Sequence, residues 1–240
     1  MDAIILAAGF GKRMKSSLPK VLHQALGKPL AEWVIQAARP LLDCPPVLVV
    51  GYGRDLVQEK FQDTVRYAVQ AEQLGTGHAV LMAKEYLEQM QGYVLVLAGD
   101  MPLLRTQTLR SLSQAAQGKA AAVLTCRLSD PTGYGRVIRD EDGQVLRIVE
   151  DRDANEAERA VQEVNTSVYC FQAQLLLHCL NQLTCDNAQQ EYYLTDCIGL
   201  LRQAGQAVTA YCVPDSSEGM GVNNQEQLKL CESILRERIG

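Results

Sequence analysis

The segment Ala3-Ile4-Ile5-Leu6-Ala7-Ala8-Gly9-Phe10-Gly11-Lys12-Arg13-Met14, with Leu18-Pro19-Lys20 close behind, joins an apolar strand to a basic turn that contains glycine. Glycine allows positive φ angles and lets the backbone approach a ligand closely. Amide N–H groups in such a turn can surround an anion, and Arg13 and Lys20 can add full positive charges. The segment therefore predicts a phosphate-binding loop at the end of a strand. The alternative is an ordinary exposed basic turn, which the loop alone does not exclude.

Two better-known phosphate-binding loops do not fit this spacing. Met14 occupies the position at which the dinucleotide fingerprint G-x-G-x-x-G needs a third glycine or an alanine. A P-loop needs Ser or Thr directly after Gly-Lys, whereas Gly11-Lys12 is followed by Arg13. The predicted loop is therefore of another kind.

The composition is typical of a soluble globular protein, because 47% of the 240 residues are hydrophobic and 21% are charged. A net charge of −5 argues against general binding to nucleic acid or to an anionic membrane. The eight cysteines lack a C-x-x-C pair, which favours buried free thiols in a reducing compartment over a zinc site. We expect a cytoplasmic protein, without a signal peptide or the roughly 20-residue apolar stretch of a membrane span.

Apolar strand patterns alternate with helical patterns through the first half of the chain. Strands are expected at 3–7, 47–50, 65–69 and 93–97, and helices at 29–39, 55–62, 77–89 and 106–117. This alternation predicts a Rossmann-like α/β fold, with a mostly parallel sheet covered by helices on both faces. In such sheets ligands bind beyond the carboxyl ends of the strands, where Gly9 and Asp100 both fall.

The middle of the chain changes to a β-rich pattern. Strands are expected at 121–128, 135–139, 145–150 and 161–171, with a polar helix near 153–159. Helices at 175–183, 194–203 and 226–236 and a strand at 207–213 complete the chain. We therefore expect one α/β domain over residues 1–225 that carries a β-rich lobe, followed by a C-terminal helix over 226–240.

Asp100 follows an apolar strand pattern that ends in Ala98-Gly99. A carboxylate at the exit of a buried strand is well placed to hold Mg²⁺, which takes one or two protein oxygens together with substrate phosphates. The alternative is an Asp that caps the next helix or fixes the turn at Met101-Pro102. The phosphate loop at another strand end favours the metal.

The segment Gln70-Ala71-Glu72-Gln73-Leu74-Gly75-Thr76-Gly77-His78 joins a strand to a helix. Thr76 can cap that helix, and the glycines leave room for a planar base against the backbone. Gln70 offers both a donor and an acceptor, which suits the imide edge of uracil or thymine. A capped turn with a solvated Gln is the alternative. We expect His78 to be a structural imidazole rather than a base.

Further motifs follow these segments in an order seen in one family: Pro131-Thr132-Gly133-Tyr134-Gly135-Arg136, Glu150, Asn165-Thr166, Glu191-Tyr192-Tyr193-Leu194-Thr195-Asp196 and Gly221-Val222-Asn223-Asn224. Over nearly its whole length the chain resembles the uridylyltransferase domain of the bifunctional GlmU family, which makes UDP-N-acetylglucosamine. The resemblance implies a nucleotide-diphospho-sugar transferase fold in which the β-rich lobe binds the sugar.

The resemblance also implies roles for individual residues. Arg13 and Lys20 would be the catalytic cations against the phosphates, and Asp100 and Asn223 would be the two protein ligands of Mg²⁺. The uracil would be recognised by Gln70, Gly75 and Thr76, and the sugar pocket would be lined by Gly135, Glu150 and Asn165. The remaining contacts to the nucleotide would come from Leu6, Ala7, Ala8, Gly9, Phe10, Gly11, Ala98 and Gly99.

The implied reaction is attack by the phosphate oxygen of N-acetylglucosamine 1-phosphate on the α-phosphorus of UTP, which yields UDP-N-acetylglucosamine and pyrophosphate. Because that nucleophile is already ionised, no general base is required. Catalysis then rests on alignment and charge neutralisation. The alternatives are another sugar 1-phosphate, dTTP as the nucleotide, or a non-catalytic sensor of UDP-sugars.

Four positions depart from the family pattern. Ala98 stands where some relatives carry Tyr or Ser, Arg152 replaces the usual Lys, and Ser167 and Gln190 occupy positions that are commonly Gly. Family members often continue into a β-helix of hexapeptide repeats that makes them trimeric. No such repeat occurs in this sequence, so we expect either a stand-alone enzyme or a piece of a longer chain, monomeric or weakly associated on its own.

Overall fold

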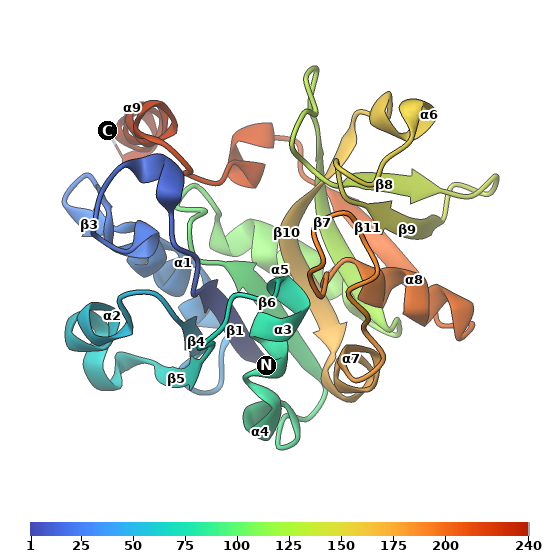
Figure 1. The fold of residues 1–240 in the computed structure, drawn as a ribbon, viewed down its shortest axis with the longest axis horizontal. Helices are drawn as coiled ribbons and strands as arrows, with labels where there is room; N and C mark the ends of the chain where they lie inside the picture. Colours follow the sequence, from blue (N-terminus) through green and yellow to red (C-terminus); the bar gives the residue numbers. More distant parts are fainter. Residues whose placement is uncertain (240) are drawn as a thin grey trace.

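A mixed nine-stranded sheet organises residues 1–239, the part of the chain that the computed structural model describes. Its strands, shown in Figure 1, are β1 (Asp2–Ala7), β4 (Val47–Val50), β5 (Arg66–Val69), β6 (Tyr93–Ala98), β7 (Ala121–Arg127), β8 (Arg136–Arg139), β9 (Val145–Val149), β10 (Glu163–Gln172) and β11 (Val208–Cys212). A separate two-stranded hairpin, which the sequence patterns did not predict, joins β2 (Gln24–Ala25) to β3 (Lys28–Pro29).

The main path of the sheet runs β11-β7-β10-β6-β1-β4-β5. All of these strands point the same way except β10, which is antiparallel to both β6 and β7. The apolar runs of β1, β4 and β6 are almost entirely buried, as strands must be when helices cover both faces. The predicted α/β fold with a mostly parallel sheet is confirmed.

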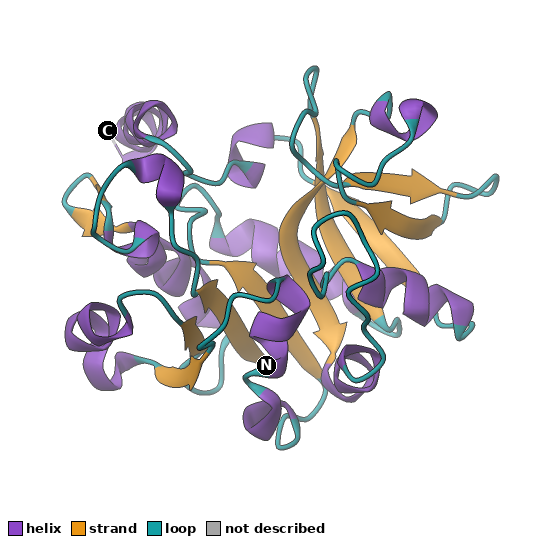
Figure 2. Cartoon of the chain, viewed as in Figure 1, coloured by secondary structure: helices purple, strands orange, loops and turns teal. Residues whose placement is uncertain are grey.

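Helices pack on both faces of this sheet, as Figure 2 shows. They are α1 (Leu30–Ala38), α2 (Arg54–Phe61), α3 (Thr76–Leu81), α4 (Lys84–Leu87), α5 (Thr106–Ala116), α6 (Glu156–Arg159), α7 (Ala173–Leu180), α8 (Asp196–Gln203) and α9 (Gln225–Ile239). One buried apolar cluster lies between the sheet and α1, α2 and α5, and a second lies between the sheet and α3, α4, α7 and α8. The two clusters hold the strand ends in place.

Two helices are shorter than the sequence patterns predicted. The helix expected over 77–89 is divided into α3 and α4, because Ala83 has a ψ of 17° and its N–H bonds to Val80 O, three residues back. The polar helix expected near 153–159 is the single turn α6, which begins at a capping box formed by Asn155 and Glu158. In both cases local hydrogen bonds end the helix sooner than side-chain periodicity suggests.

Strand β10 connects the sheet to the β-rich lobe. Its last residues pair with β6, whereas Val164 pairs with Arg136 of β8, which in turn pairs with β9. Against β7, the register shifts between Asn165 and Tyr169. Ser167, at the centre of this bulge, has a φ of 62°. Bulges re-aim side chains, and this one lies where β10 passes the carboxyl end of β6.

The lobe leaves and re-enters the sheet at adjacent points. Leu128 N–H, just after β7, donates to Gln162 O, just before β10, at 3.1 Å. Beyond β11 the chain returns to the first half of the molecule, where α9 buries Cys231 and Leu235 against Leu103 and its neighbours. The division between residues 1–225 and a helix over 226–240 stays a prediction, and Gly240 lies outside the described residues. None of the helices within residues 1–239 is long and apolar enough to cross a membrane.

Candidate functional site

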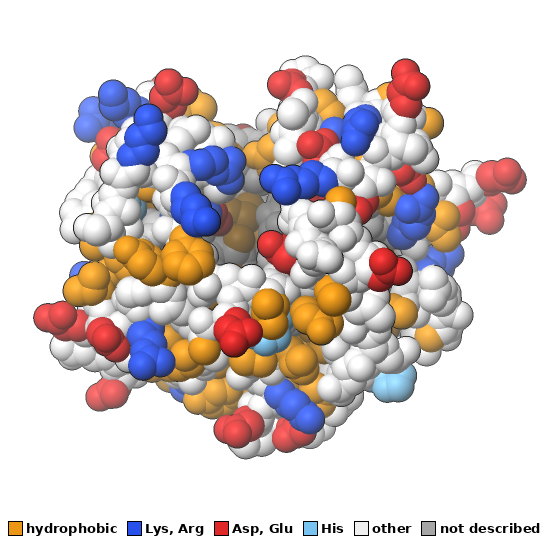
Figure 3. Space-filling view, viewed as in Figure 1, with side chains coloured by type: hydrophobic (Ala, Val, Ile, Leu, Met, Phe, Trp, Pro, Cys, Tyr) orange, Lys and Arg blue, Asp and Glu red, His pale blue; other side chains and the backbone are white. Residues whose placement is uncertain are grey.

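A cavity of about 510 Å³ opens at the carboxyl ends of β1 and β6 and reaches the β-rich lobe. Figure 3 shows the hollow, with Lys and Arg side chains at its rim. The site residues predicted from the sequence line it except Phe10, Gly11 and Gly99. Gly99 is buried, and its N–H bonds to Leu6 O at 2.9 Å. A second cavity, of about 420 Å³, lies behind Glu150 and includes no residue of the phosphate loop.

The loop after β1 is held by contacts at both of its ends. Gly11 has a φ of 63°, and a Cβ at this position would lie 2.8 Å from the Cβ of Lys20. Met14 is buried against α9, which anchors the short helical turn at Lys12–Met14. Phe10 does not line the cavity; it is 43% exposed, and its ring centre lies 5.2 Å from that of Tyr52. Glycine at position 11 therefore allows the loop to pack directly on Lys20.

The predicted catalytic cations contact the predicted metal ligands. Lys20 Nζ forms an ion pair with Asp100 Oδ2 and donates to Asn223 Oδ1 at 3.0 Å. Arg13 Nη2 donates to the same Asn223 oxygen at 3.0 Å. A carboxylate oxygen and a carboxamide oxygen thus converge on one positive group, and these are the hard oxygen donors that Mg²⁺ prefers. The donor set fits a divalent cation.

The segment between β5 and α3 is tightly packed. Gln70 is only 3% exposed, and its Nε2 donates to Gly75 O at 3.0 Å. Gly75 has a φ of 110°, and a Cβ there would lie 2.6 Å from Tyr192 O, so no other residue fits. Contrary to the expectation, the side chain of Thr76 does not cap α3. Its Oγ1 accepts from Leu194 N–H at 3.1 Å. The hydroxyl joins α3 to the 191–196 segment instead.

The β-rich lobe contributes Gly135, Glu150 and Asn165, which meet at the far end of the cavity. A Cβ on Gly135 would lie 3.5 Å from Glu150 Oε2 and 3.6 Å from the Cβ of Asn165. Thr195 donates its hydroxyl proton to Glu150 Oε1 at 2.9 Å. Burial raises the pKa of Glu150, and nearby carboxylates, Asp196 foremost, raise it further. The site therefore holds a desolvated carboxyl group with one oxygen fixed by Thr195.

Asn165 is oriented by two bonds on opposite sides of its amide. Its Nδ2 donates to Tyr169 Oη at 2.7 Å, and its Oδ1 accepts from Ser167 N–H at 3.1 Å. Tyr169 is buried, with 2% of its surface exposed. Sequence reasoning missed this phenol because it lies within an apolar strand pattern, and it left Thr195 without a role although the residue belongs to a quoted motif.

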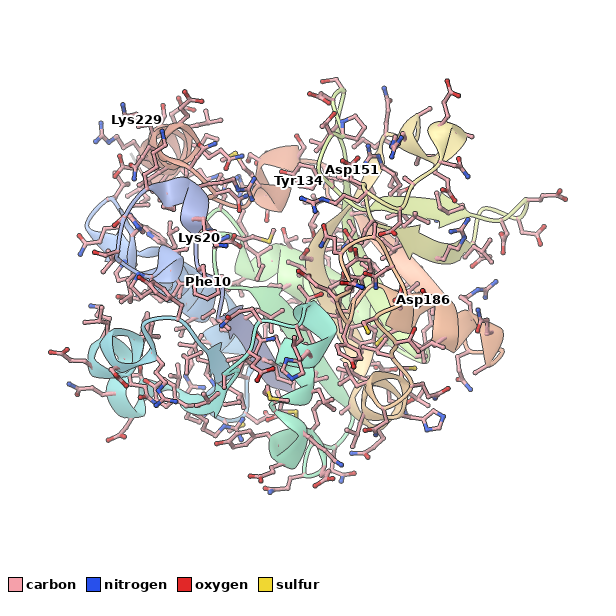
Figure 4. All side chains as sticks on the ribbon, in the orientation of Figure 1. Phe10, Lys20, Tyr134, Asp151, Asp186 and Lys229 are labelled. Atoms are coloured by element: carbon pink, nitrogen blue, oxygen red, sulfur yellow. The ribbon has the colours of Figure 1, made fainter. Side chains whose placement is uncertain are left out.

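An ion pair connects the strands that carry Gly135 and Glu150. Arg136 is 2% exposed, and its Nη2 lies 2.9 Å from Asp151 Oδ1. Each partner directly follows one of the predicted sugar ligands in the sequence. Figure 4 shows Tyr134 and Asp151 on one side of the cavity and Lys20 and Phe10 on the other. The cavity thus lies between a cationic side, built from the first half of the chain, and the β-rich lobe.

Two of the four departures from the family pattern have a common structural setting. Ser167 has a φ of 62° and Gln190 has a φ of 54°, and the resemblance led us to expect Gly at both positions. The left-handed region is strained for residues that carry a Cβ. Glycine would adopt either conformation without this strain.

Comparison with known proteins agrees with this geometry. The model of the MobA-like NTP transferase domain matches residues 3–189. Relatives named bifunctional protein GlmU include those of Caldanaerobacter subterraneus subsp. tengcongensis, 47% identical over 99% of this chain and 52% of the relative, and of Limosilactobacillus fermentum, 50% identical over 99% of this chain and 53% of the relative. A third, from Pelobacter propionicus, is 50% identical over 99% of this chain and 52% of the relative.

The resemblance inferred from the motifs is confirmed by these relatives. The chain spans about half the length of the curated relatives it matches. The family model covers well over half of the chain and includes the phosphate loop, Asp100 and the β-rich lobe. The protein therefore belongs to the MobA-like NTP transferase family.

Proposed function

We propose that this protein transfers UMP from UTP to N-acetylglucosamine 1-phosphate, giving UDP-N-acetylglucosamine and pyrophosphate. The observation that carries the proposal is the single cavity joining the phosphate loop, the Asp100–Asn223 pair, the Gln70 segment and the Glu150 pocket. The name of the relatives, bifunctional protein GlmU, supports the same reaction.

Each side of the cavity has a distinct task in this reaction. Arg13 and Lys20 neutralise charge on the α-phosphate and on the departing pyrophosphate. Gln70 and the backbone of Gly75 and Thr76 hold the uracil. No side chain has to remove a proton, because the attacking phosphate oxygen is already ionised. Catalysis comes from bringing two polyanions into line in a site that tolerates their charge.

We propose Mg²⁺ as the cofactor, held by Asp100 and Asn223. Nucleotidyl transfer generally uses a divalent cation, which neutralises charge on the reacting phosphates when bound. Lys20 contacts both oxygens, so its ammonium must move away when a metal ion is held there. Its long side chain can then turn toward the phosphates, which is the role that the resemblance implies for it.

On the sugar side, Glu150, Asn165 and the backbone of Gly135 bind N-acetylglucosamine 1-phosphate in this proposal. Glu150 Oε2 lies beside Gly135, and Asn165 keeps one amide hydrogen beyond its bond to Tyr169. A buried carboxylate and a fixed amide recognise hydroxyl and amide groups more selectively than exposed ones, because an unsuitable ligand leaves them unpaired.

The test is a matrix of nucleotides (UTP, dTTP and CTP) against N-acetylglucosamine 1-phosphate and glucose 1-phosphate, with pyrophosphate release as the readout. We expect the highest kcat/KM for UTP with N-acetylglucosamine 1-phosphate, and no turnover in excess chelator until Mg²⁺ is restored. UTP binding without turnover in Mg²⁺ would show a sensor instead. A preference for another pair of substrates would redefine the enzyme.

We propose a cytoplasmic location and a monomeric or weakly associated state for this chain. All eight cysteines are free, and most are buried, which suits a reducing compartment. Light scattering tests the oligomeric state, and a stable trimer would contradict it.

A further inference from the structure

We infer that His78 is a positioning residue that fixes the amide of Gln70, so that the base pocket offers an acceptor and thereby selects uracil over cytosine. The inference rests on the proposed function, because it takes the Gln70 pocket as the place where the base binds. It gives a role to an imidazole that the proposed reaction does not use.

The orientation of the Gln70 amide follows from its contact with a main-chain carbonyl. One terminal atom of Gln70 lies 3.0 Å from Gly75 O. A carbonyl oxygen can only accept, so this atom must be the nitrogen. The same nitrogen lies 3.1 Å from His78 Nδ1. Both hydrogens of the amide are therefore taken, one by Gly75 O and one by His78.

This geometry also fixes the tautomer of His78. Because Gln70 Nε2 donates to His78 Nδ1, that ring nitrogen must carry a lone pair and the ring proton must reside on Nε2. A flipped amide would bring Gln70 Oε1 against Gly75 O, and it would require the proton of His78 to move from Nε2 to Nδ1. Two acceptors facing each other in a position that is 3% exposed are unfavourable.

The oxygen of Gln70 remains available to a ligand. Within residues 1–239 no group donates a hydrogen bond to Oε1, and this oxygen is not among the enclosed atoms that lack a partner. Gln70 lines the cavity, and Oε1 is the amide atom that a ligand there can still engage. The pocket therefore presents one fixed acceptor at this point.

The two acceptors that hold Gln70 are themselves rigid. Tyr192 N–H donates to Leu74 O at 2.8 Å, and Gly77 N–H donates to Tyr192 O at 2.7 Å, so the segment around Gly75 is paired on both sides. The His78 and Tyr192 ring centres lie 6.3 Å apart. Neither acceptor can readily turn away, and the Gln70 amide has one stable orientation.

The consequence for the base follows from the atoms on its edge. Uracil and thymine carry an N3–H group, from which Gln70 Oε1 can accept a hydrogen bond. Cytosine carries a bare N3 acceptor, which would face Oε1 without a proton between them. Discrimination of this kind comes from repulsion of the wrong ligand as well as attraction of the right one.

The experiment compares the kcat/KM ratio of UTP to CTP in the parent, in His78→Phe and in His78→Asn, with the KM for the sugar phosphate as an internal check. Phe keeps the ring but removes the acceptor, whereas Asn places an oxygen near the position of Nδ1. We expect the UTP to CTP ratio to fall about tenfold in His78→Phe, the effect of one lost hydrogen bond. His78→Asn should retain most of the ratio, and the sugar KM should stay within twofold.

A ratio that is unchanged in His78→Phe, or equal losses for both nucleotides, would overturn the inference. If His78→Phe does not fold, His78→Gln takes its place, because its longer side chain carries the amide past the Nδ1 position. Calorimetric titration with UTP and CTP, without a sugar phosphate, separates the two proposals. If the parent binds UTP over CTP but turns over neither, the proposed function fails and the His78 role is still tested by binding. A parent that binds both equally overturns the His78 role alone.

Discussion

The two sides of the cavity recognise their ligands by different means. On the phosphate side, Lys20 pairs with Asp100, and both Lys20 and Arg13 donate to Asn223, in positions partly open to solvent. On the sugar side, Glu150 and Asn165 are held by the neutral, buried hydroxyls of Thr195 and Tyr169. The first arrangement can exchange partners when a polyanion arrives. The second is already in place before any ligand binds.

This difference suits the two binding tasks. Phosphates carry several charges and need cations that can follow them through bond cleavage. A sugar must be distinguished from similar sugars, which requires donors and acceptors that cannot rearrange to suit the wrong one. We therefore expect substitutions on the phosphate side to lower the rate, and substitutions on the sugar side to weaken binding.

The largest effect is expected for Lys20→Ala on the phosphate side. Loss of one positioned cation should lower kcat by about 10²–10³, with a normal melting curve, because charge stabilisation in the transition state is lost. Pyrophosphate release measures the rate. Lys12→Ala is the matched control, since Lys12 is an exposed lysine of the same loop that does not line the cavity, and its rate should stay near the parent. Equal losses in both variants would contradict the role of Lys20.

Glu150→Gln should come next, and it should act on binding. Removing the charge should raise the KM for the sugar phosphate about 10- to 100-fold, the range for hydrogen bonds to a charged group, and leave the KM for UTP unchanged. Initial rates with each substrate varied in turn provide the measurement. A loss confined to kcat would place Glu150 with the phosphate groups and remove the contrast between the two sides.

The same variant has a second, opposite effect on stability. Burial and the nearby carboxylates raise the pKa of Glu150, so the folded protein holds this proton more tightly than the unfolded chain. The stability from the protonated group is full below the ordinary value of 4.5 and is lost as the pH rises through the folded pKa. Glu150→Gln should melt above the parent at pH 7, and the difference should shrink toward pH 4.5. A variant that melts lower at pH 7 would refute this.

Tyr169→Phe should produce a smaller change on the sugar side. Asn165 Nδ2 loses its phenol acceptor, so the amide turns more freely, and the KM for the sugar phosphate should rise about 3- to 10-fold. Phe171, the neighbour whose ring stacks on Tyr169, provides a control: Phe171→Leu removes a buried ring of the same strand without touching Asn165. An equal rise in the KM for UTP in Tyr169→Phe would show a general disturbance of β10.

The smallest effect is expected for Gln190→Gly, a substitution that lies on neither side of the cavity. Gln190 is exposed and has a φ of 54°, so a glycine should stabilise the fold by about 1 kcal/mol by removing left-handed strain. Thermal melting should rise by about 2–4 °C at unchanged activity. Gln189→Gly, one residue earlier and outside the left-handed region, should lower the melting temperature.

The contrast between the two sides also explains what the sequence could reveal. Glycines and lysines close together in the chain predicted the phosphate loop, and apolar runs predicted the strands that place Gly9 and Asp100 at one edge. Which residues these groups contact was harder to predict from the sequence. The contact of Lys20 with Asp100 spans 80 positions, and that with Asn223 spans 203.

Residues that orient others left the weakest signals. Tyr169 looks like one more apolar residue of a strand, and His78 looked purely structural, because its contact with Gln70 depends on how the segment folds back. The division of the helix expected over 77–89 was missed for a similar reason: the main-chain bond from Ala83 N–H to Val80 O, which separates α3 from α4, leaves no mark on side-chain periodicity. Residues that bind a ligand directly can be recognised by their residue type, whereas the residues that orient them depend on how the chain packs.

The bond between Leu128 N–H and Gln162 O gives the β-rich lobe the character of an exchangeable part. A chain that departs and returns at neighbouring points can accept a replacement of different length without moving the remainder. We expect a graft over 129–161, the segment that carries Gly135 and Glu150, to change the recognised sugar while keeping the chemistry of the phosphate side. Strands β7 and β10, with their pairing to β11 and β6, lie outside this segment and stay in place.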